Sequence, residues 1–435
     1  MEIIKDKERP RAIVVGLRIK QKKQTSVNGV TNEDDCLEEL SLLLDTLGVD
    51  VILKEIQYRE SPSPATYIGE GKVNELSQYA REKNISMVVF DNELSSAQAR
   101  NLSKIFGIGV FDRTEIILDI FSKHAKTKAA KIQVDIAKME FMMSRIQGLW
   151  SHFDRQKGGI GLKDAGEKQI ELDRRLIRDR ISRLKKNLIH IENIKNTQRK
   201  LREDIIQVAL VGYTNAGKTT IMNALTDSDL LVENKLFATL DSTVKILNPG
   251  NRPKILISDT VGFIDKLPHR LIASFKSTLD ELYSADLILH VVDISSGNIE
   301  KHIEVTHRVL DELKVNDKPS FIVFNKVDTL KGELLLSKLI KRKYLESIMI
   351  SAHKEQDIMG LRSKIINFFE NRMLDVEIEI PYTLQDKLYE IHQVARIIDT
   401  KYNDDCVYLK FKIAATHYDR LVLEKYVVRG KNGKL

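Results

Sequence analysis

The feature that most constrains this chain is one stretch, 205 IIQVALVGYTNAGKTTIMNAL 225. It begins with a β-branched apolar run typical of a buried strand, breaks at Gly212, and continues as a helix-compatible segment after Gly217. The spacing G-x4-G-K-T, which ends at Lys218 and Thr219, matches a P-loop. Backbone N–H groups of such a loop surround a triphosphate, the lysine reaches its outer phosphates and the hydroxyl ligates Mg2+. The sequence therefore predicts a nucleotide-binding strand, loop and helix.

Further short motifs follow the P-loop in the order that a GTPase requires. The motif 259 DTVG 262 ends an apolar run, and its carboxylate would hold Mg2+ through water while the Gly262 amide meets the γ-phosphate. The motif 325 NKVD 328 ends the run 319–324, and Asp328 can accept both N–H groups of the guanine edge, which adenine lacks. Ser351-Ala352 would support the base with a backbone N–H. Each motif alone is weak, since Asp at a strand end commonly caps a helix or turn, but in register they predict GTP.

The segment 236 LFATLDST 243 lies between the P-loop and Asp259. Its Thr239 is the candidate for the mobile threonine that closes on Mg2+ and the γ-phosphate, with a plain turn hydroxyl as the alternative. The predicted catalytic residues are Lys218, Thr239, Asp259 and Gly262, and the predicted metal ligands are Thr219 and Thr239. The predicted nucleotide-binding residues are Gly212, Tyr213, Thr214, Asn215, Ala216, Gly217, Lys218, Thr219, Phe237, Ala238, Thr239, Leu240, Asp241, Asp259, Thr260, Val261, Gly262, Asn325, Lys326, Val327, Asp328, Ser351, Ala352 and His353.

Two positions near the phosphates suggest how hydrolysis is controlled. Many GTPases place a water-orienting glutamine after the glycine of the second motif, and this chain has Phe263 there. A hydrophobic ring cannot make that hydrogen bond, so we expect slow hydrolysis until a partner completes the site. Asn215 resembles the asparagine of potassium-activated GTPases, so K+ near Asn215 is a second hypothesis, and a role in loop shape alone is the alternative.

The positive charge of the chain is concentrated in one segment. The 435 residues carry a formal net charge of +7, yet residues 121–203 hold 21 Lys+Arg against 10 Asp+Glu. The rest of the chain is therefore slightly acidic. A basic segment of this kind favours a polyanion such as RNA, and a solvated helical face is the alternative.

Length and composition bound the class of protein. A chain of 435 residues with 30% charged and 42% hydrophobic residues predicts a globular protein of two or three domains. Cys36 and Cys406 are the only cysteines and lie far apart, as in a reduced intracellular protein. Because we find neither an apolar run of about 18 residues nor a signal-peptide pattern, we expect a cytoplasmic protein, with peripheral membrane association left open.

Apolar runs alternate with helix-compatible segments over residues 1–115, which predicts a small α/β layer. The predicted strands are 12–17, 49–56, 87–91 and 109–112, and the predicted helices are 32–47, 71–84 and 95–106. The loop 61 SPSPATYIGEGK 72 leads into one of these helices. It is interpreted as tight turn chemistry, with anion binding as the alternative.

From Thr114 onward the pattern is typical of long helices. One apolar stripe runs from Ile132 to Ile146 and another from Ile177 to Ile191, both at steps of four and three, which predicts an antiparallel helical hairpin. The predicted join, 148–166, is rich in glycine, with aromatic and cationic residues suited to phosphates and unstacked bases. A merely mobile loop is the alternative. The residues concerned are Gly148, Trp150, His152, Arg155, Lys157, Gly158, Gly159, Gly161, Lys163 and Gly166.

The remaining sequence completes an α/β fold class. Residues 204–371 alternate apolar runs and helices, which predicts a doubly wound sheet with its ligand at the carboxyl ends of the strands. Residues 372–435 have strand-like pieces at 376–382 and 406–413 around a helix near 384–396, which predicts a small C-terminal α/β module. The predicted domains are 1–203, comprising an α/β region at 1–115 and the basic hairpin 116–203, then the G domain 204–371 and the module 372–435.

The combination of 212 GYTNAGKTT 220, 237 FATLD 241, 259 DTVGFI 264 and 325 NKVD 328 resembles the HflX family of translational GTPases. Upstream segments are similar as well: 67 YIGEGKVNEL 76, 112 DRTEIILDIFSKHAKT 127, 158 GGIG 161 and 166 GEKQIELDRR 175. The likeness covers residues 10–371 well and the C-terminal module loosely. Thr219 replaces the usual serine and keeps the hydroxyl, whereas 162 LKDAGE 167 departs from the family's Arg-Gly-Pro-Gly-Glu wording. That departure concerns the contacts of the hairpin loop more than the enzymatic assignment.

The resemblance implies a monomeric, Mg2+-dependent GTPase that binds the large ribosomal subunit and its rRNA near the peptidyl transferase centre and splits stalled or idle ribosomes. It also implies a link to ATP binding and RNA remodelling. A ribosome-assembly GTPase and a nucleotide-regulated RNA-binding or RNA-remodelling protein are the alternatives. Measured hydrolysis and the fate of 70S ribosomes separate these functions.

Overall fold

The computed structural model describes residues 9–19, 35–153, 163–200, 205–226, 236–237, 239, 242–247, 254–266, 280–330, 334–421 and 427–429. The chain forms two compact units. The first contains residues 1–192 together with the short segments 234–240 and 266–276, and the second contains residues 193–233, 241–265 and 277–435. Phe237 and Lys266, described residues of these two short segments, therefore belong to the first unit.

A parallel sheet with the strand order β2-β1-β3-β4 forms the centre of the first unit. Apolar residues of β1 and β3 pack against the second and third helices in one buried core. The α/β layer predicted from the alternation is therefore confirmed. The strands are β1 (Arg11–Ile19), β2 (Asp50–Arg59), β3 (Met87–Phe90) and β4 (Gly109–Asp112), and the helices are α1 (Asp35–Leu47), α2 (Glu70–Glu82), α3 (Ser96–Phe106) and α4 (Arg113–His124).

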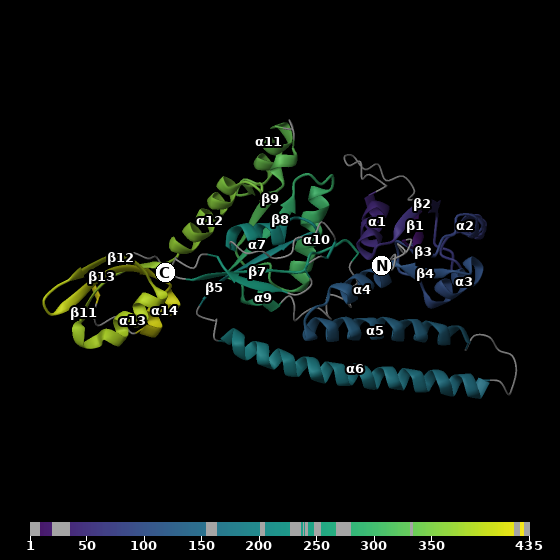
Figure 1. The fold of residues 1–435 in the computed structure, drawn as a ribbon, viewed down its shortest axis with the longest axis horizontal. Helices are drawn as coiled ribbons and strands as arrows, with labels where there is room; N and C mark the ends of the chain where they lie inside the picture. The colour runs from purple at the N-terminus through teal and green to yellow at the C-terminus, as the bar shows by residue number, and fades with distance from the viewer. Residues whose placement is uncertain are drawn as a thin grey trace, which may run out of the picture. The chain divides into compact units, whose positions relative to one another are not determined.

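Two long helices follow, α5 (Lys128–Phe153) and α6 (Lys163–Lys200), and they run side by side in opposite directions (Figure 1). Ile132 and Ile136 of α5 and Ile181 of α6 are buried between them, and further members of both predicted stripes pack around this centre. The antiparallel hairpin predicted from the two apolar stripes is confirmed.

The predicted join between these helices was too long. Trp150 and His152 lie within α5, and Lys163 and Gly166 lie within α6, so both helices enter the interval 148–166. A glycine inside a helix costs only about 1 kcal/mol relative to alanine, so a glycine-rich composition did not end the helices there. The central residues of the interval, among them Arg155, Lys157, Gly158, Gly159 and Gly161, lie outside the described residues.

The second unit contains a six-stranded sheet with the order β10-β9-β8-β5-β7-β6. Neighbouring strands are parallel except for β6, which pairs antiparallel with β7 at one edge. The doubly wound sheet is confirmed, and the antiparallel edge was not predicted. The strands are β5 (Ile206–Gly212), β6 (Thr243–Ile246), β7 (Ile255–Asp259), β8 (Leu287–Asp293), β9 (Ser320–Asn325) and β10 (Ile348–Met349).

Helices cover this sheet through two separate apolar clusters. Side chains of α7 (Lys218–Thr226) and α12 (Glu355–Glu370) share one cluster with β5, β7 and β8. Ile303 of α10 (Ile299–Glu312) and Ile340 of α11 (Leu334–Lys343) belong to another. The short α9 (Asp280–Ser284) precedes β8.

The last region of the chain forms an antiparallel sheet with the order β12-β13-β11-β14. The element order β-α-β-β-α-β is that of a split βαβ fold, in which helices cover one face of the sheet. The small α/β module is confirmed, although β12, α14 and β14 were not predicted. Its elements are β11 (Leu374–Pro381), α13 (Gln385–Val394), β12 (Arg396–Tyr402), β13 (Cys406–Ile413), α14 (Ala415–Leu421) and β14 (Val427–Arg429).

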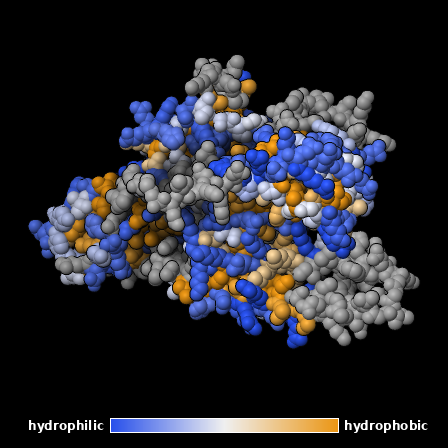
Figure 2. All heavy atoms as spheres, turned by 45° about the vertical axis from the view of Figure 1, so that its right-hand side comes forward, coloured by the Kyte–Doolittle hydropathy of each residue, from blue (hydrophilic) through white to orange (hydrophobic). Residues whose placement is uncertain are grey.

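Hydrophilic side chains are spread over the visible surface, with hydrophobic ones interspersed among them (Figure 2). Among the helices that the structure describes, none has the length and apolar character needed to span a membrane.

Candidate nucleotide site

The loop between β5 and α7 has a backbone conformation that requires glycine at two positions. Gly212 has φ +148°, and a Cβ there would lie 2.1 Å from the carbonyl oxygen of Val291 on β8. Gly217 has φ +90°, and a Cβ would lie 2.2 Å from Nδ2 of Asn325. L side chains rarely adopt such φ angles, so both positions require glycine. The strand, loop and helix order predicted from the sequence is present.

Lys218 lies over this loop as the first residue of α7. Its amine donates hydrogen bonds to the carbonyl oxygens of Gly212, at 3.2 Å, and Tyr213, at 3.0 Å. Burial lowers the pKa of Lys218 to about 8, although the nearby Asp259 carboxylate favours the charged form. A buried amine in this position is suited to an anion that restores its charge.

Thr219 and Asp259 place two oxygen donors together at the carboxyl ends of β5 and β7. The Thr219 hydroxyl donates to Oδ2 of Asp259 at 2.5 Å, and Asp259 is fully buried. The neighbouring Thr260 hydroxyl donates to the Leu210 carbonyl at 2.7 Å, which fixes the strand end. Hydroxyl and carboxylate oxygens are ligands that Mg2+ accepts, so the donor set fits this ion.

The segment 236–243 is described only at some positions. Phe237 is buried with φ +56°, and its ring meets that of Phe121 of α4 edge to face with centroids 4.7 Å apart. Thr239 is partly buried, and its role as a metal ligand stays a prediction. Ala238, Leu240 and Asp241 lie outside the described residues.

The motif 259–262 continues into a buried segment. Val261 and Phe263 are buried, and a backbone bridge joins Phe263 to Tyr213 of the P-loop. The Phe263 ring is therefore held in the interior. Thr214 and Ala216 of the P-loop are buried as well, whereas Asn215 is exposed with φ +60°.

At the other end of the site, Asn325 ties three loops together. Its Nδ2 donates to the Ala216 carbonyl at 3.0 Å, and its Oδ1 accepts the Ala352 N–H at 3.0 Å. The Val327 N–H donates to the Ile350 carbonyl at 3.3 Å, and the Ser351 N–H donates to the Asp357 carboxylate at 2.8 Å. Ala216 and Asn325 lie 109 residues apart in the sequence, and the structure brings them together.

Asp328 is exposed beside this junction, where a base can reach it. The neighbouring Ser351 side chain lowers the pKa of Asp328, so the carboxylate stays ionised. Lys326 has a left-handed backbone and pairs with Asp293 of β8 at 2.6 Å. His353 is exposed nearby in the chain. The pairing of Lys326 with Asp293 was not predicted, because no spacing rule connects residues so far apart.

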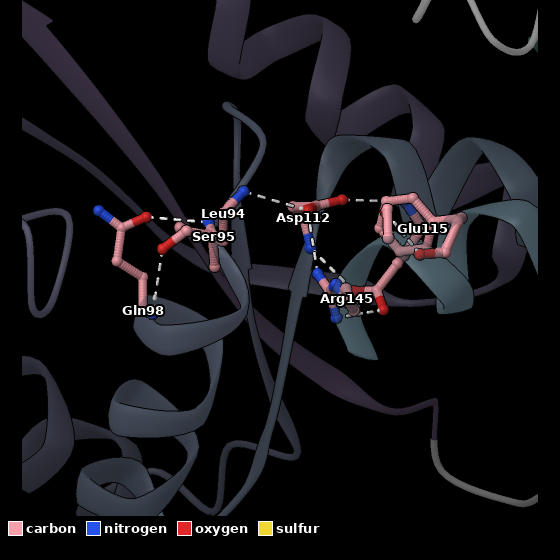
Figure 3. A network of polar contacts seen from close by, with 8 residues as sticks. Leu94, Ser95, Gln98, Asp112, Glu115 and Arg145 are labelled. Carbon is pink, nitrogen blue, oxygen red and sulfur yellow. Dashed lines mark hydrogen bonds and ion pairs between the residues drawn. The ribbon is translucent and has the colours of Figure 1, made fainter. Parts of the chain in front are cut away.

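A polar network in the first unit anchors α5 to the end of β4 (Figure 3). The buried Asp112 carboxylate accepts the Leu94 N–H at 3.2 Å and pairs with Arg145 of α5 at 3.0 Å. Arg145 also pairs with Glu115 at 2.6 Å. Burial raises the pKa of Glu115 to about 7 despite the Arg145 charge. The segment beginning 112 DRTE therefore fixes the helical hairpin to the sheet.

A second ion network in the first unit includes Lys266, which follows the motif 259–264. The Lys266 amine pairs with the fully buried Asp91 at 2.5 Å, and Arg113 pairs with the same carboxylate at 3.0 Å. Arg113 also contacts Glu39 of α1. Lys266 is thus paired with a carboxylate at the carboxyl end of β3, a contact for which the sequence carries no signal.

Hydrogen bonds and ion pairs with neighbouring residues hold the loop 61–72. Its Gly69 N–H donates to Oε1 of Gln57 at 2.7 Å, and Lys72 pairs with Glu55 and Glu75 at 2.8 and 2.9 Å. Because the amide and the lysine already have protein partners, the structure favours turn chemistry over anion binding.

The described residues of α6 present an extended basic surface. Its exposed cations lie outside the apolar stripe that meets α5, and one of them, Lys185, pairs with Glu140 of α5 at 2.7 Å. They are Arg175, Arg178, Arg180, Arg183, Lys185 and Lys186. The side chains of Trp150, His152, Arg155, Lys157 and Lys163 are not among those described, so the contacts of the hairpin tip stay predictions.

Three family models match consecutive regions of the chain. They are described as GTP-binding GTPase N-terminal, over residues 34–122, GTP-binding GTPase Middle Region, over 124–202, and 50S ribosome-binding GTPase, over 207–326.

The chain is also similar to whole proteins. GTPase HflX of Flavobacterium psychrophilum is 50% identical over 295 residues, which cover 68% of this chain and 71% of that protein. GTPase HflX of Magnetococcus marinus is 40% identical over 388 residues, which cover 88% and 89%. Among solved structures, a GTP-binding protein from the archaeon Sulfolobus solfataricus in complex with GDP is 24% identical, with 82% of this chain and 98% of that chain covered and a TM-score of 0.42.

Proposed function

Because the chain belongs to the HflX family of GTPases, we propose that it is a GTP-driven switch that binds the large ribosomal subunit and splits stalled or idle ribosomes. Membership of this family makes it a P-loop enzyme that hydrolyses GTP. The observation that carries the proposal is the presence of a GTPase site and a basic helical hairpin in one chain. The description of the model matched by residues 207–326, 50S ribosome-binding GTPase, supports the same partner.

In this proposal the phosphate end of the site binds GTP with Mg2+. The loop amides and the Lys218 amine neutralise the phosphates; Thr219 and Thr239 would ligate the metal, and Asp259 would hold it through water. Mg2+ supplies charge stabilisation at the β- and γ-phosphates. The Gly262 amide donates to the γ-phosphate. At the other end Asp328 accepts the guanine N–H groups, and the backbone of Ser351, Ala352 and His353 borders the base.

Hydrolysis needs a group that orients the attacking water molecule by a hydrogen bond, and the buried Phe263 ring has no such group. We therefore expect ribosome binding to reorder the segments 236–243 and 259–270 and complete the site. Single-turnover GTP hydrolysis should be faster with large subunits than without them, and equal rates would refute this step of the proposal. K+ bound near the exposed Asn215 is a further candidate for charge stabilisation, and identical rates in KCl and NaCl exclude it.

The hairpin supplies the ribosome-binding arm. Arginines and lysines on the exposed face of α6 suit rRNA phosphates, and the tip between α5 and α6 is the candidate for contact with bases near the peptidyl transferase centre. The division into an N-terminal domain 1–203, a G domain 204–371 and a C-terminal module 372–435 follows the same assignment.

Sedimentation of 70S ribosomes with the full chain and a non-hydrolysable GTP analogue tests the function. We expect the protein to comigrate with large subunits while the 70S peak decreases. Comigration without loss of 70S would instead favour a role in subunit assembly, and failure to comigrate would refute ribosome binding.

Two variants sharpen the sedimentation experiment. Asp328→Asn removes guanine recognition and should abolish splitting at the same GTP concentration. A triple variant with Arg178, Arg180 and Arg183 replaced by Gln removes exposed positive charge from α6, so it should bind GTP normally and sediment less with large subunits. If Asp328→Asn leaves an ATP-dependent activity intact, a second nucleotide function would replace the proposal.

A further inference from the structure

Main-chain hydrogen bonds hold the segment after Gly262 against the P-loop. The Phe263 N–H donates to the Gly212 carbonyl at 3.1 Å, and the Thr214 N–H donates to the Phe263 carbonyl at 2.8 Å. A Cβ on Gly262 would lie 2.8 Å from Cα of Thr214 and 3.1 Å from Nζ of Lys218. Gly262 therefore lies directly beside the phosphate-binding loop, with no room for a side chain.

Tyr213 of the P-loop holds the end of this segment through its side chain. Its hydroxyl accepts the Asp265 N–H at 2.7 Å. The ring is only 6% exposed and is stacked on His302 of α10, with centroids 3.8 Å apart and planes 11° from parallel. A stacked, buried ring has few alternative positions, so the hydroxyl is a fixed acceptor.

Asp265 also contacts α10 directly. Its carboxylate pairs with Lys301 at 2.8 Å, and Lys301 precedes His302 on α10. The ion pair is partly exposed, with Lys301 at 43%, and such pairs contribute little on their own. The hydrogen bond to the Tyr213 hydroxyl is therefore the contact that fixes Asp265 more strongly.

We propose that Tyr213 is a positioning residue for GTP hydrolysis, which acts through the Asp265 amide to keep Gly262 and Phe263 in place against the P-loop. Phe263 has no side-chain group that can orient water, so the geometry at the γ-phosphate depends on the backbone of this segment, above all on the Gly262 amide. Donors that are fixed before the reaction stabilise a transition state more than donors that must be reorganised. The inference concerns the hydrolytic step and does not depend on the ribosome as partner.

Tyr213→Phe in the full chain removes only the hydroxyl and tests this role. We expect single-turnover hydrolysis at saturating GTP, without ribosomes, to slow by about three- to tenfold, the value of one neutral hydrogen bond. The dissociation constants of GTP and GDP and the melting temperature should stay near those of the wild type. Tyr344→Phe is the matched control, since Tyr344 lies in the same unit and packs on Phe324 away from these loops.

A pair of substitutions at His302 separates positioning from folding. His302→Phe keeps an aromatic surface under Tyr213 and should keep the wild-type rate, whereas His302→Leu removes the stack and should slow hydrolysis with unchanged GDP affinity. A Tyr213→Phe rate equal to or above the wild-type rate overturns the proposal. So does a slower rate accompanied by an equal loss of GTP and GDP affinity, because that result describes a general disturbance of the P-loop.

Discussion

The nucleotide motifs and the residues that flank some of them in sequence belong to different units of the molecule. At the base end, Asn325 joins the P-loop to the loop at Ala352, and these residues all belong to the second unit. Phe237, which precedes the candidate Thr239, packs on Phe121, and Lys266, which follows the motif 259–264, pairs with Asp91; these residues all belong to the first unit.

This difference predicts that guanine affinity and the packing of the first unit respond to different substitutions. The contacts of Asn325 lie within the second unit, so we expect guanine affinity to depend on that unit. Phe237 and Lys266 lie next to the phosphate motifs in sequence, yet their described contacts are within the first unit. The two ends can be separated experimentally, in decreasing order of expected effect.

Asp328→Asn should weaken GTP and GDP binding by about 100-fold or more, because two charge-assisted hydrogen bonds to guanine are lost. Equilibrium titration with a fluorescent guanine nucleotide measures the effect. Asp328 is exposed, so the melting temperature should not change. Asp317→Asn, at another exposed aspartate of the same unit, should bind like the wild type, and equal affinities for both variants would contradict the assignment of the base end.

Phe237→Ala should destabilise the first unit by about 3 kcal/mol, because it removes a buried ring from the contact with Phe121. Hydrogen exchange of the full chain should show faster exchange in α4, where Phe121 lies, and little change in α12. Loss of protection in α12 with none in α4 would show that Phe237 belongs energetically to the second unit.

GTP affinity should fall about tenfold between pH 7 and pH 9, because the Lys218 amine has a pKa of about 8 in the free protein and the phosphates bind its charged form. Below pH 8 the amine is already protonated, and above it the proton must be taken up on binding. Guanosine carries the same base without phosphates and is the control. A parallel decline in guanosine affinity would place the pH dependence at the base end instead.

Glu115→Gln should make the stability of the first unit less dependent on pH. The change in melting temperature with pH should be smaller than in the wild type by a few degrees. Burial raises the pKa of Glu115 from 4.5 to about 7, so its stabilising contribution is complete below pH 4.5 and is lost as the pH rises through 7. The variant, neutral throughout, should gain stability relative to the wild type between pH 5 and pH 8. Melting curves that remain parallel over this range would show that Glu115 does not titrate there.

Much of the fold follows from local patterns. Buried parallel strands such as β1 and β8 are continuous apolar runs, and the stripes of α5 and α6 repeat at helical spacing, so their type and order could be predicted. The ends of the hairpin helices could not, because a glycine inside a helix costs only about 1 kcal/mol relative to alanine and does not by itself end the helix. The short strands β12 and β14 have no strong alternation and depend on pairing with β13 and β11.

Some features of the candidate site could likewise be predicted from local sequence, and others could not. Local sequence alone specifies the P-loop and the guanine motif, because each is a short backbone shape that a few residues at fixed spacing encode. Only the tertiary structure shows that the Tyr213 hydroxyl accepts the Asp265 N–H and that Asp293 pairs with Lys326. It also shows that Phe237 and Lys266 contact residues of the first unit. These contacts join residues far apart in the chain, and their partners are selected by the packing of whole elements, which no local spacing encodes.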